Sequence, residues 1–234
     1  MKVVLLHAFP LDERMWEPQR EALADHDVVA PNLYELGGNS VDGWAERILA
    51  DLEGDFVVVG ASMGGYVALA MARQAPGRVR GLVLAGARPN EDSPERRAGR
   101  ADTIRLIREQ GASGLWENQR SKLLADDASD EAVASAREMA LARDQDELVS
   151  AIEAIRDRPE SSDALRTVEA PVVFALGAAD LFFPVEEAEA VAAESGGRLV
   201  VFDRSRHLPN LEQPAEFNEM LLAFLRDRDS FLGQ

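Results

Sequence analysis

Cysteine is absent from this 234-residue chain, which excludes disulfide bonds, a thiolate nucleophile and cysteine-based metal sites. Basic residues are also scarce, because 25 Lys and Arg stand against 42 Asp and Glu and leave a net charge of -17. Such a charge repels nucleic-acid backbones and anionic membranes, so neither is an expected partner. The lack of cysteine is compatible with a cytoplasmic location, which is our expectation.

Long hydrophobic runs are missing as well. The apolar stretch at the N-terminus, MKVVLL, ends at His7 and is followed by Pro10, Asp12 and Glu13. It is too short for the core of a signal peptide or for a membrane span, and we interpret it as a buried strand. Hydrophobic residues still make up 46% of the chain, which is enough for one sizeable core with room for an inserted subdomain.

Six short runs rich in β-branched residues alternate with helical segments. Runs such as VVV and LVLA are apolar on both faces, which is typical of parallel strands covered on both sides, and they predict an α/β fold with a mostly parallel sheet. The predicted strands are Lys2–Leu6, Asp27–Ala30, Phe56–Gly60, Val79–Ala85, Val172–Leu176 and Leu199–Phe202. The predicted helices between and after them are Val41–Leu52, Gly64–Gln74, Pro184–Glu194 and Pro214–Arg228.

The pattern changes between residues 90 and 166, where no convincing strand occurs. Ser93 followed by Pro94 is typical of a helix start, with a capping side chain and a first-turn proline. The predicted amphipathic helices of this region are Pro94–Gln110, Ser113–Leu124, Ser129–Arg143 and Asp146–Arg156. A helical block inserted after the fourth strand predicts a cap, residues 90–166, over a core made of residues 1–89 and 167–234.

The stretch Gly60-Ala61-Ser62-Met63-Gly64 matches the pattern G-x-S-x-G and lies between a predicted strand and a predicted helix. The pattern places its serine on a strained turn, with small residues where the backbones of strand and helix nearly touch. In this setting it predicts Ser62 as a nucleophile. The alternative is a purely structural glycine-rich turn.

A serine hydroxyl needs a base within hydrogen-bond reach, and the chain has only three histidines. Sites in doubly wound sheets form beyond the carboxyl ends of the strands, which favours His207, just after the last strand. His7 ends the first strand, where it either stabilises a turn or contacts the substrate, and His26 is interpreted as a solvated loop residue. Asp180, in the loop after the fifth strand, is the predicted acidic partner of the base, with Asp92 as the reserve candidate.

A tetrahedral intermediate also needs N–H donors. We expect them from the backbone of Met63, at the start of a helix, and of Phe9, in the turn after the first strand. The chain order Ser62, Asp180, His207 is the order expected for a nucleophile on a strand-to-helix turn.

Substrate choice is expected to lie in the cap. Arg100 shares one helix face with Ile104 and Ile107, and it is a candidate for receiving a substrate carboxylate. The alternative for this arginine is a solvated helix surface. Trp116 and Met139 are candidates for an apolar wall of the substrate pocket, with simple packing as the alternative.

Four segments in this order make the chain similar to the α/β-hydrolase superfamily along nearly its whole length. They are LLHAFPLDERMWEPQ for the oxyanion turn, VVGASMGGYVALAMA for the nucleophile turn, LGAADLFFP for the acid loop and HLPNLEQPAEFN for the histidine segment. Within the superfamily the chain resembles small bacterial carboxylesterases and 3-oxoadipate enol-lactonase-like proteins. The resemblance implies that Ser62, Asp180 and His207 hydrolyse a small ester or lactone through an acyl-enzyme, with Phe9 and Met63 as oxyanion donors.

The resemblance also implies no metal and no cofactor, a small-molecule substrate, and a monomer or homodimer. It leaves the reaction open, because C–C bond hydrolases, thioesterases and perhydrolases use the same catalytic set and some members of the fold bind ligands without catalysis. The chain departs from the family pattern at several places, among them Pro31-Asn32-Leu33, where relatives commonly have Pro-Asp-Leu. Ala8 replaces the glycine that commonly follows His7, which predicts a slightly shifted turn, and Arg206 stands where a glycine often precedes the histidine.

Overall fold

A computed structural model of the protein describes residues 1–227 and contains one six-stranded sheet. All six strands run parallel, in the order β2-β1-β3-β4-β5-β6. Each predicted strand is confirmed to within one residue at its ends. The strands are β1 (Lys2–Leu6), β2 (Asp27–Val29), β3 (Phe56–Ala61), β4 (Val79–Ala85), β5 (Val172–Gly177) and β6 (Arg198–Phe202).

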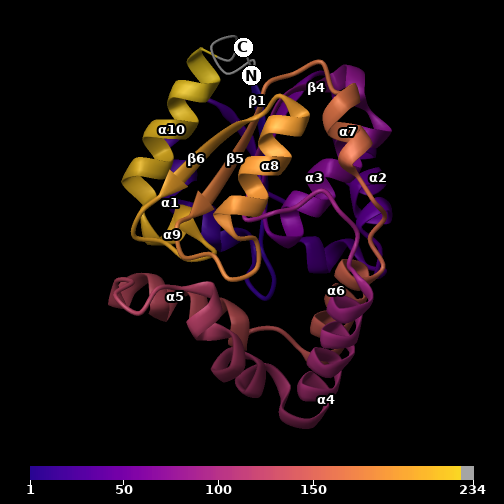
Figure 1. Ribbon diagram of the computed structural model, residues 1–234, viewed down its shortest axis with the longest axis vertical. Coiled ribbons are helices and arrows are strands. Elements are labelled where there is room, and N and C mark those ends of the chain that lie inside the picture. The colour runs from indigo at the N-terminus through magenta and orange to yellow at the C-terminus, as the bar shows by residue number, and fades with distance from the viewer. Residues whose placement is uncertain (228–234) are drawn as a thin grey trace.

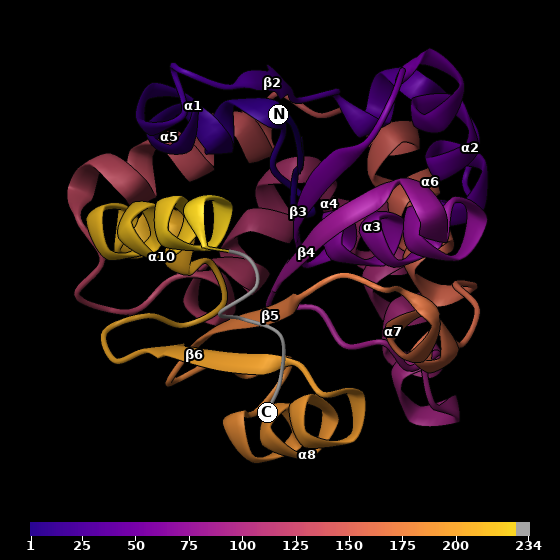
Figure 2. The same cartoon turned by 90° about the horizontal axis from the view of Figure 1, so that it is seen from above.

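The continuous apolar strands are buried on both faces of the sheet. In β3 every residue is buried, and successive side chains alternate between two core clusters: Phe56 and Val58 join one, and Val57 and Val59 join the other. Helices α2, α3 and α8 cover the first face, and α1 and α10 cover the second (Figure 2). Their bounds are Val41–Asp51, Met63–Gln74 and Val185–Ser195 for the first group, and Glu17–Ala22 and Pro214–Arg226 for the second.

The four helices predicted for the core are confirmed with shifts of one or two residues, except that Arg228, at the predicted end of the last one, lies outside the described residues. The short elements were not predicted, because three to six residues carry too little periodicity. Besides α1, they are the helices α7 (Ser162–Thr167) and α9 (Pro209–Glu212) and the 3-10 turns η1 (Glu13–Trp16), η2 (Leu33–Leu36) and η3 (Pro76–Arg78).

Three helices lie across the end of the sheet where β5 and β6 finish (Figure 1). They are α4 (Pro94–Leu123), α5 (Asp130–Leu141) and α6 (Gln145–Arg156), and the side chain of Ser93 caps α4 as predicted. Helix α4 contains a kink at Gly111, whose φ of 65° is non-helical. This kink lies at the predicted break between the helices Pro94–Gln110 and Ser113–Leu124, which the structure joins into α4. None of the helices within residues 1–227, α4 included, has the length and apolar character needed to cross a membrane.

The predicted division into a core (1–89 and 167–234) and a cap (90–166) stays a prediction. All of helix α7 except Thr167 falls inside the predicted cap, yet the helix packs against α3 and α8 of the core. We therefore propose that the cap proper consists of α4 to α6 and that α7 is part of the core layer.

Candidate active site

Ser62 occupies a strained turn between β3 and α3. Its φ of 48° and ψ of -111° make it the only residue other than glycine with a positive φ in residues 1–227. A side chain at Gly60 would collide with the backbone of Gly64, and one at Gly64 with the carbonyl of Leu6, so both positions require glycine. Such a backbone costs about 1–3 kcal/mol and persists only where the surroundings hold it. Here the Ser62 N–H donates to the Ala85 carbonyl at 2.7 Å, which anchors the turn to β4.

His207 and Asp180 form a buried pair beside this turn. His207 Nδ1 lies 2.8 Å from Asp180 Oδ2, while Asp180 Oδ1 accepts the N–H groups of Phe182 and Phe183 at 2.7 and 3.1 Å. Because an ionised carboxylate only accepts hydrogen bonds, His207 Nδ1 must carry the proton. The other ring nitrogen, Nε2, is thereby left as an acceptor, which is the state a general base requires.

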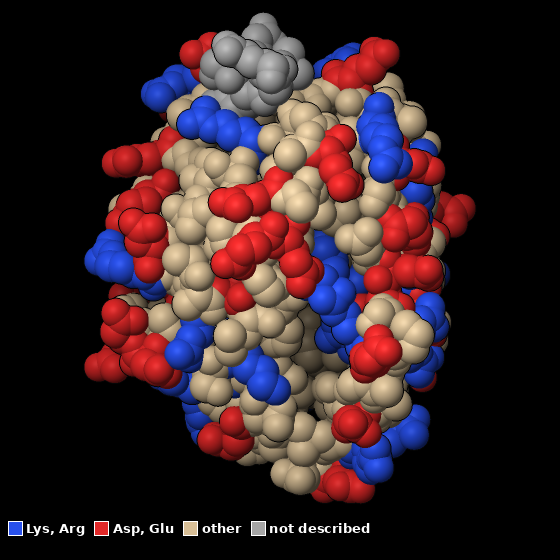
Figure 3. Space-filling view, viewed as in Figure 1, with Lys and Arg blue, Asp and Glu red and all other residues tan. Residues whose placement is uncertain are grey.

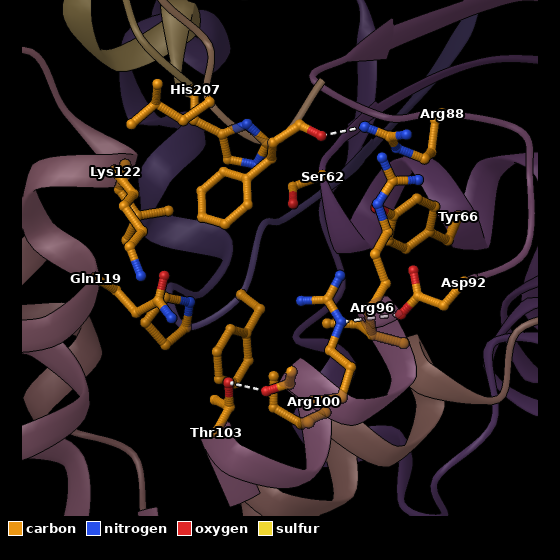
Figure 4. A pocket seen from close by; sticks show the side chains of 18 of the residues that line it. Ser62, Tyr66, Arg88, Asp92, Arg96, Arg100, Thr103, Gln119, Lys122 and His207 are labelled. Atoms are coloured by element: carbon orange, nitrogen blue, oxygen red, sulfur yellow. Dashed lines mark hydrogen bonds and ion pairs between the residues drawn. The ribbon is translucent and has the colours of Figure 1, made fainter. Parts of the chain in front are cut away.

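Ser62 and His207 line one cavity of about 350 Å³ between the sheet and the cap (Figure 4). Asp180 lies behind His207 and does not line the cavity. The other lining residues are Phe9, Pro10, Tyr66, Arg88, Asp92, Arg96, Gly99, Arg100, Thr103, Gln119, Lys122, Leu123, Ile152, Ile155, Leu181, Phe182, Pro184 and Glu187. Within residues 1–227, no group of three or more His, Asp and Glu side chains is placed to hold a metal ion.

The two backbone amides predicted as oxyanion donors lie close to Ser62 in the fold. Phe9 lines the cavity, and Met63 is the first residue of α3, where backbone N–H groups have no partner inside the helix. Neither amide donates a hydrogen bond to any part of the chain that the structure describes. We therefore propose that both are free to donate to an oxygen bound next to Ser62.

The arrangement of turn, histidine and acid on a parallel sheet with a helical cap invites comparison with known proteins. The sequence profile of the alpha/beta hydrolase family matches residues 3–220. The chain belongs to this family. The predicted superfamily and the predicted fold, a parallel sheet of six strands flanked by helices with a helical insertion after the fourth strand, are thus confirmed.

Relatives of this alpha/beta hydrolase include esterases. It is 30% identical to the pimeloyl-(acyl-carrier protein) methyl ester esterase of Aromatoleum aromaticum, over 92% of this chain and 94% of that protein. A thermophilic esterase from Thermogutta terrifontis superposes with a TM-score of 0.89 and 31% identity, over 97% of this chain and 89% of that one. The enol-lactonase from Burkholderia xenovorans shares the fold, with a TM-score of 0.82 and 22% identity over 96% and 91% of the two chains.

His7 stabilises the turn after β1 in this hydrolase, and it does not line the cavity. Its ring is buried, Nε2 accepts the Leu33 N–H at 2.9 Å, and Nδ1 lies 3.2 Å from the Ala8 carbonyl. Ala8 itself has no positive φ, so alanine carries no conformational cost at the position where relatives commonly have glycine. Of the two roles predicted for His7, the geometry matches the turn-stabilising one.

The pH dependence of stability should reveal the buried state of His7. Burial lowers the pKa of this histidine from 6.5 to about 4, so the unfolded chain binds a proton at a higher pH than the folded one. The neutral ring therefore stabilises the fold fully above pH 6.5, and this contribution is lost as the pH falls toward 4. We expect wild-type protein to lose about 2 kcal/mol of unfolding free energy relative to a His7→Gln variant between pH 7.5 and 5. Urea titrations at both pH values measure this difference, and parallel profiles for the two proteins would contradict it.

Arg100 lies on the wall of the cavity, whereas Asp92 is not the partner of His207. The Asp92 carboxylate, the reserve candidate, accepts hydrogen bonds from Arg100 Nε at 3.0 Å and from Arg158 Nη1 at 2.7 Å. Two parts of α4 line the cavity: Arg96, Gly99, Arg100 and Thr103 before the kink at Gly111, and Gln119, Lys122 and Leu123 after it. Ile104 and Ile107, which share a helix face with Arg100 by their spacing, are buried in the core cluster that includes residues of α6.

Trp116 and Met139 are buried in the cap and do not line the cavity. Both belong to a cluster of buried side chains that also contains Leu123, Ala136 and Ala140, so they pack α4 against α5. Their positions match the alternative of simple packing, and other residues form the apolar part of the cavity wall.

Arg88 is a cavity residue that the sequence analysis missed. It lies just beyond the end of β4, and parallel sheets commonly place binding sites beyond the carboxyl ends of their strands. That position in the sequence could have identified Arg88 as a candidate. Its guanidinium donates to Glu187 at 2.8 Å and to the carbonyl of Phe182. Burial lowers the pKa of Arg88 from its ordinary value. The ring centroid of Phe182 lies 4.6 Å from that of His207, so this arginine supports the wall beside His207.

Arg206 stands where relatives often have glycine, and its side chain connects the loop of His207 to the cap. Its guanidinium donates to the carbonyl of Ser121 and, at 3.1 and 3.0 Å, to the carboxylate of Asp126. The backbone N–H of His207 also donates to the carbonyl of Leu123 at 3.2 Å. The end of α4 therefore helps to position His207, and Arg206 has a structural role at the place where relatives often have glycine.

Proposed function

We propose that this protein is a serine hydrolase that cleaves a small carboxylic ester or lactone through an acyl-enzyme on Ser62. The observation that carries the proposal is that the strained Ser62 and His207 line one cavity, while Asp180 engages His207 Nδ1 from outside the cavity. The tautomer of the pair leaves His207 Nε2 as the acceptor that a serine nucleophile needs. Membership in the alpha/beta hydrolase family and the likeness to named esterases support the same reaction.

In the first half-reaction the Ser62 hydroxyl attacks the carbonyl carbon while its proton passes to His207 Nε2. Asp180 stabilises the imidazolium that forms, and the N–H groups of Phe9 and Met63 stabilise the oxyanion. Collapse of the tetrahedral intermediate breaks the bond to the alcohol oxygen, which leaves with the proton from His207.

In the second half-reaction a water molecule gives a proton to His207 and attacks the acyl-enzyme. Collapse of this second intermediate releases the carboxylic acid and returns the proton to Ser62. The protein supplies every group that the cycle requires, so this proposal includes no cofactor.

Covalent labelling with a fluorophosphonate tests the nucleophile directly. We expect one equivalent of the probe to react with the folded protein, and peptide mass spectrometry to find it on Ser62. Heat-denatured protein should remain unlabelled, because the free serine hydroxyl is a weak nucleophile without its base. An unlabelled native protein, or a label on another serine, would refute the proposal.

A further inference from the structure

The cavity wall contains two clusters in which two arginines share one carboxylate. Asp92 pairs with Arg100 and with the buried Arg158, at 3.0 and 2.7 Å. Glu187 pairs with Arg88 at 2.8 Å and more loosely with Arg96 at 3.8 Å. Each cluster keeps one positive charge that no acid neutralises within it, and all of these residues except Arg158 line the cavity.

Arg100 directs its uncommitted donors into the cavity. Its Nε is held by Asp92, which fixes the orientation of the guanidinium, whereas no hydrogen bond within the described residues engages Nη1 or Nη2. Figure 4 shows this guanidinium pointing toward the space below Ser62. A fork of two parallel N–H donors fits a carboxylate, and its fixed orientation removes part of the entropic cost of binding.

Lys122 brings another positive charge to the opposite wall, from the last turn of α4. Its only hydrogen bond within the described residues is a long one of 3.4 Å to Asn118 Oδ1. In Figure 4 its ammonium group points into the cavity across from Arg100. Cationic groups therefore face the cavity from two sides.

This cationic cavity occurs in a protein whose net charge is -17. Figure 3 shows Lys and Arg side chains gathered along the hollow, while acidic side chains are spread over the face around it. Positive groups that crowd together repel one another, and a hollow with low-dielectric walls strengthens their effect on an anion inside it. The excess charge thus lies where a bound anion would compensate it.

We propose that the substrate carries a free carboxylate besides the bond that is cleaved, as a half-ester of a short dicarboxylic acid does, and that Arg100 binds this carboxylate. Lys122 lies on the other wall and adds a weaker, longer-range attraction. This inference rests on the proposed ester hydrolysis and specifies its substrate class. A cavity of about 350 Å³ holds an acyl chain of a few carbons with a carboxylate at its far end.

The test compares monomethyl glutarate with the neutral dimethyl glutarate. We expect wild-type protein to prefer the half-ester in kcat/KM by about tenfold or more, the size typical of one charge-assisted pair. Arg100→Gln should remove this preference, because KM rises much more for the half-ester than for the neutral diester. Arg100→Lys should retain part of the preference. Arg105→Gln, on an exposed arginine of the same helix that lies outside the cavity, is the matched control and should behave as wild type.

Inhibition distinguishes a carboxylate from other anions. Glutarate should compete with the neutral diester in wild-type protein and should do so less in Arg100→Gln, whereas inorganic phosphate at least as potent as glutarate would overturn the choice of carboxylate. Equal loss on both esters in Arg100→Gln, or no preference in wild type, would overturn the inference while ester hydrolysis stands. If neither ester is hydrolysed and Ser62 is not labelled by the fluorophosphonate, the proposed function fails instead.

Discussion

Replacing Ser62 by alanine is expected to lower kcat for ester hydrolysis by roughly 10⁴- to 10⁶-fold. The variant lacks the oxygen that forms the acyl-enzyme, and His207 then has no hydroxyl to activate. Residual activity comes from the oxyanion donors and from binding alone, so KM should change little. Steady-state kinetics on a neutral ester, with single-turnover detection for the variant, measures the loss. Wild-type activity in Ser62→Ala would exclude the proposed nucleophile.

The same position offers a control for folding. Alanine has a Cβ, so Ser62→Ala keeps the positive φ of 48° and its strain, and its unfolding free energy should stay near that of wild type. Glycine adopts this φ without strain, so Ser62→Gly should be inactive but about 1 kcal/mol more stable, as thermal unfolding would show. Such an exchange of stability for activity is expected where backbone strain serves a reaction. A destabilised Ser62→Gly would argue against stored strain at the turn.

The sequence was sufficient to predict the elements that depend on local patterns. The strands of the sheet are continuously apolar because both faces are covered, and this pattern does not need tertiary information. The turn at Ser62 follows from glycines at 60 and 64, since no other residue fits there. With only three histidines in the chain, the position of His207 after the last strand was enough to place it near the carboxyl edge.

Side-chain partners and helix rotation were harder to predict. Whether Asp180 or Asp92 faces the histidine depends on Arg158, which approaches Asp92 from 66 residues away and engages its carboxylate. On α4, the spacing of side chains identifies faces but does not determine which face is turned to the cavity. The kink at Gly111 and the packing against α6 set that rotation, so Arg100 reaches the cavity while Trp116 is buried in the cap.

Replacing Asp180 by asparagine should lower kcat by about 10³- to 10⁴-fold with little change in KM. The N–H groups of Phe182 and Phe183 both require an acceptor at the position of Oδ1, so the asparagine must place its carbonyl oxygen there. Its NH₂ group then faces His207 Nδ1 across the 2.8 Å contact and donates to it, which moves the ring proton to Nε2. That nitrogen faces the cavity and can no longer accept the proton of Ser62.

Because the amide introduced by Asp180→Asn has a defined orientation, the variant changes the tautomer of His207 and does more than remove a charge. Asp180→Asn should fold with near-native stability, because it keeps the hydrogen bonds to both N–H groups, and its defect should appear in acylation when burst kinetics separate the two half-reactions. The matched control is Asp203→Asn, at an exposed aspartate in the turn just after β6, which should retain wild-type kinetics. A full-activity Asp180→Asn, or a loss expressed only in KM, would show that the buried carboxylate does not set the tautomer of His207.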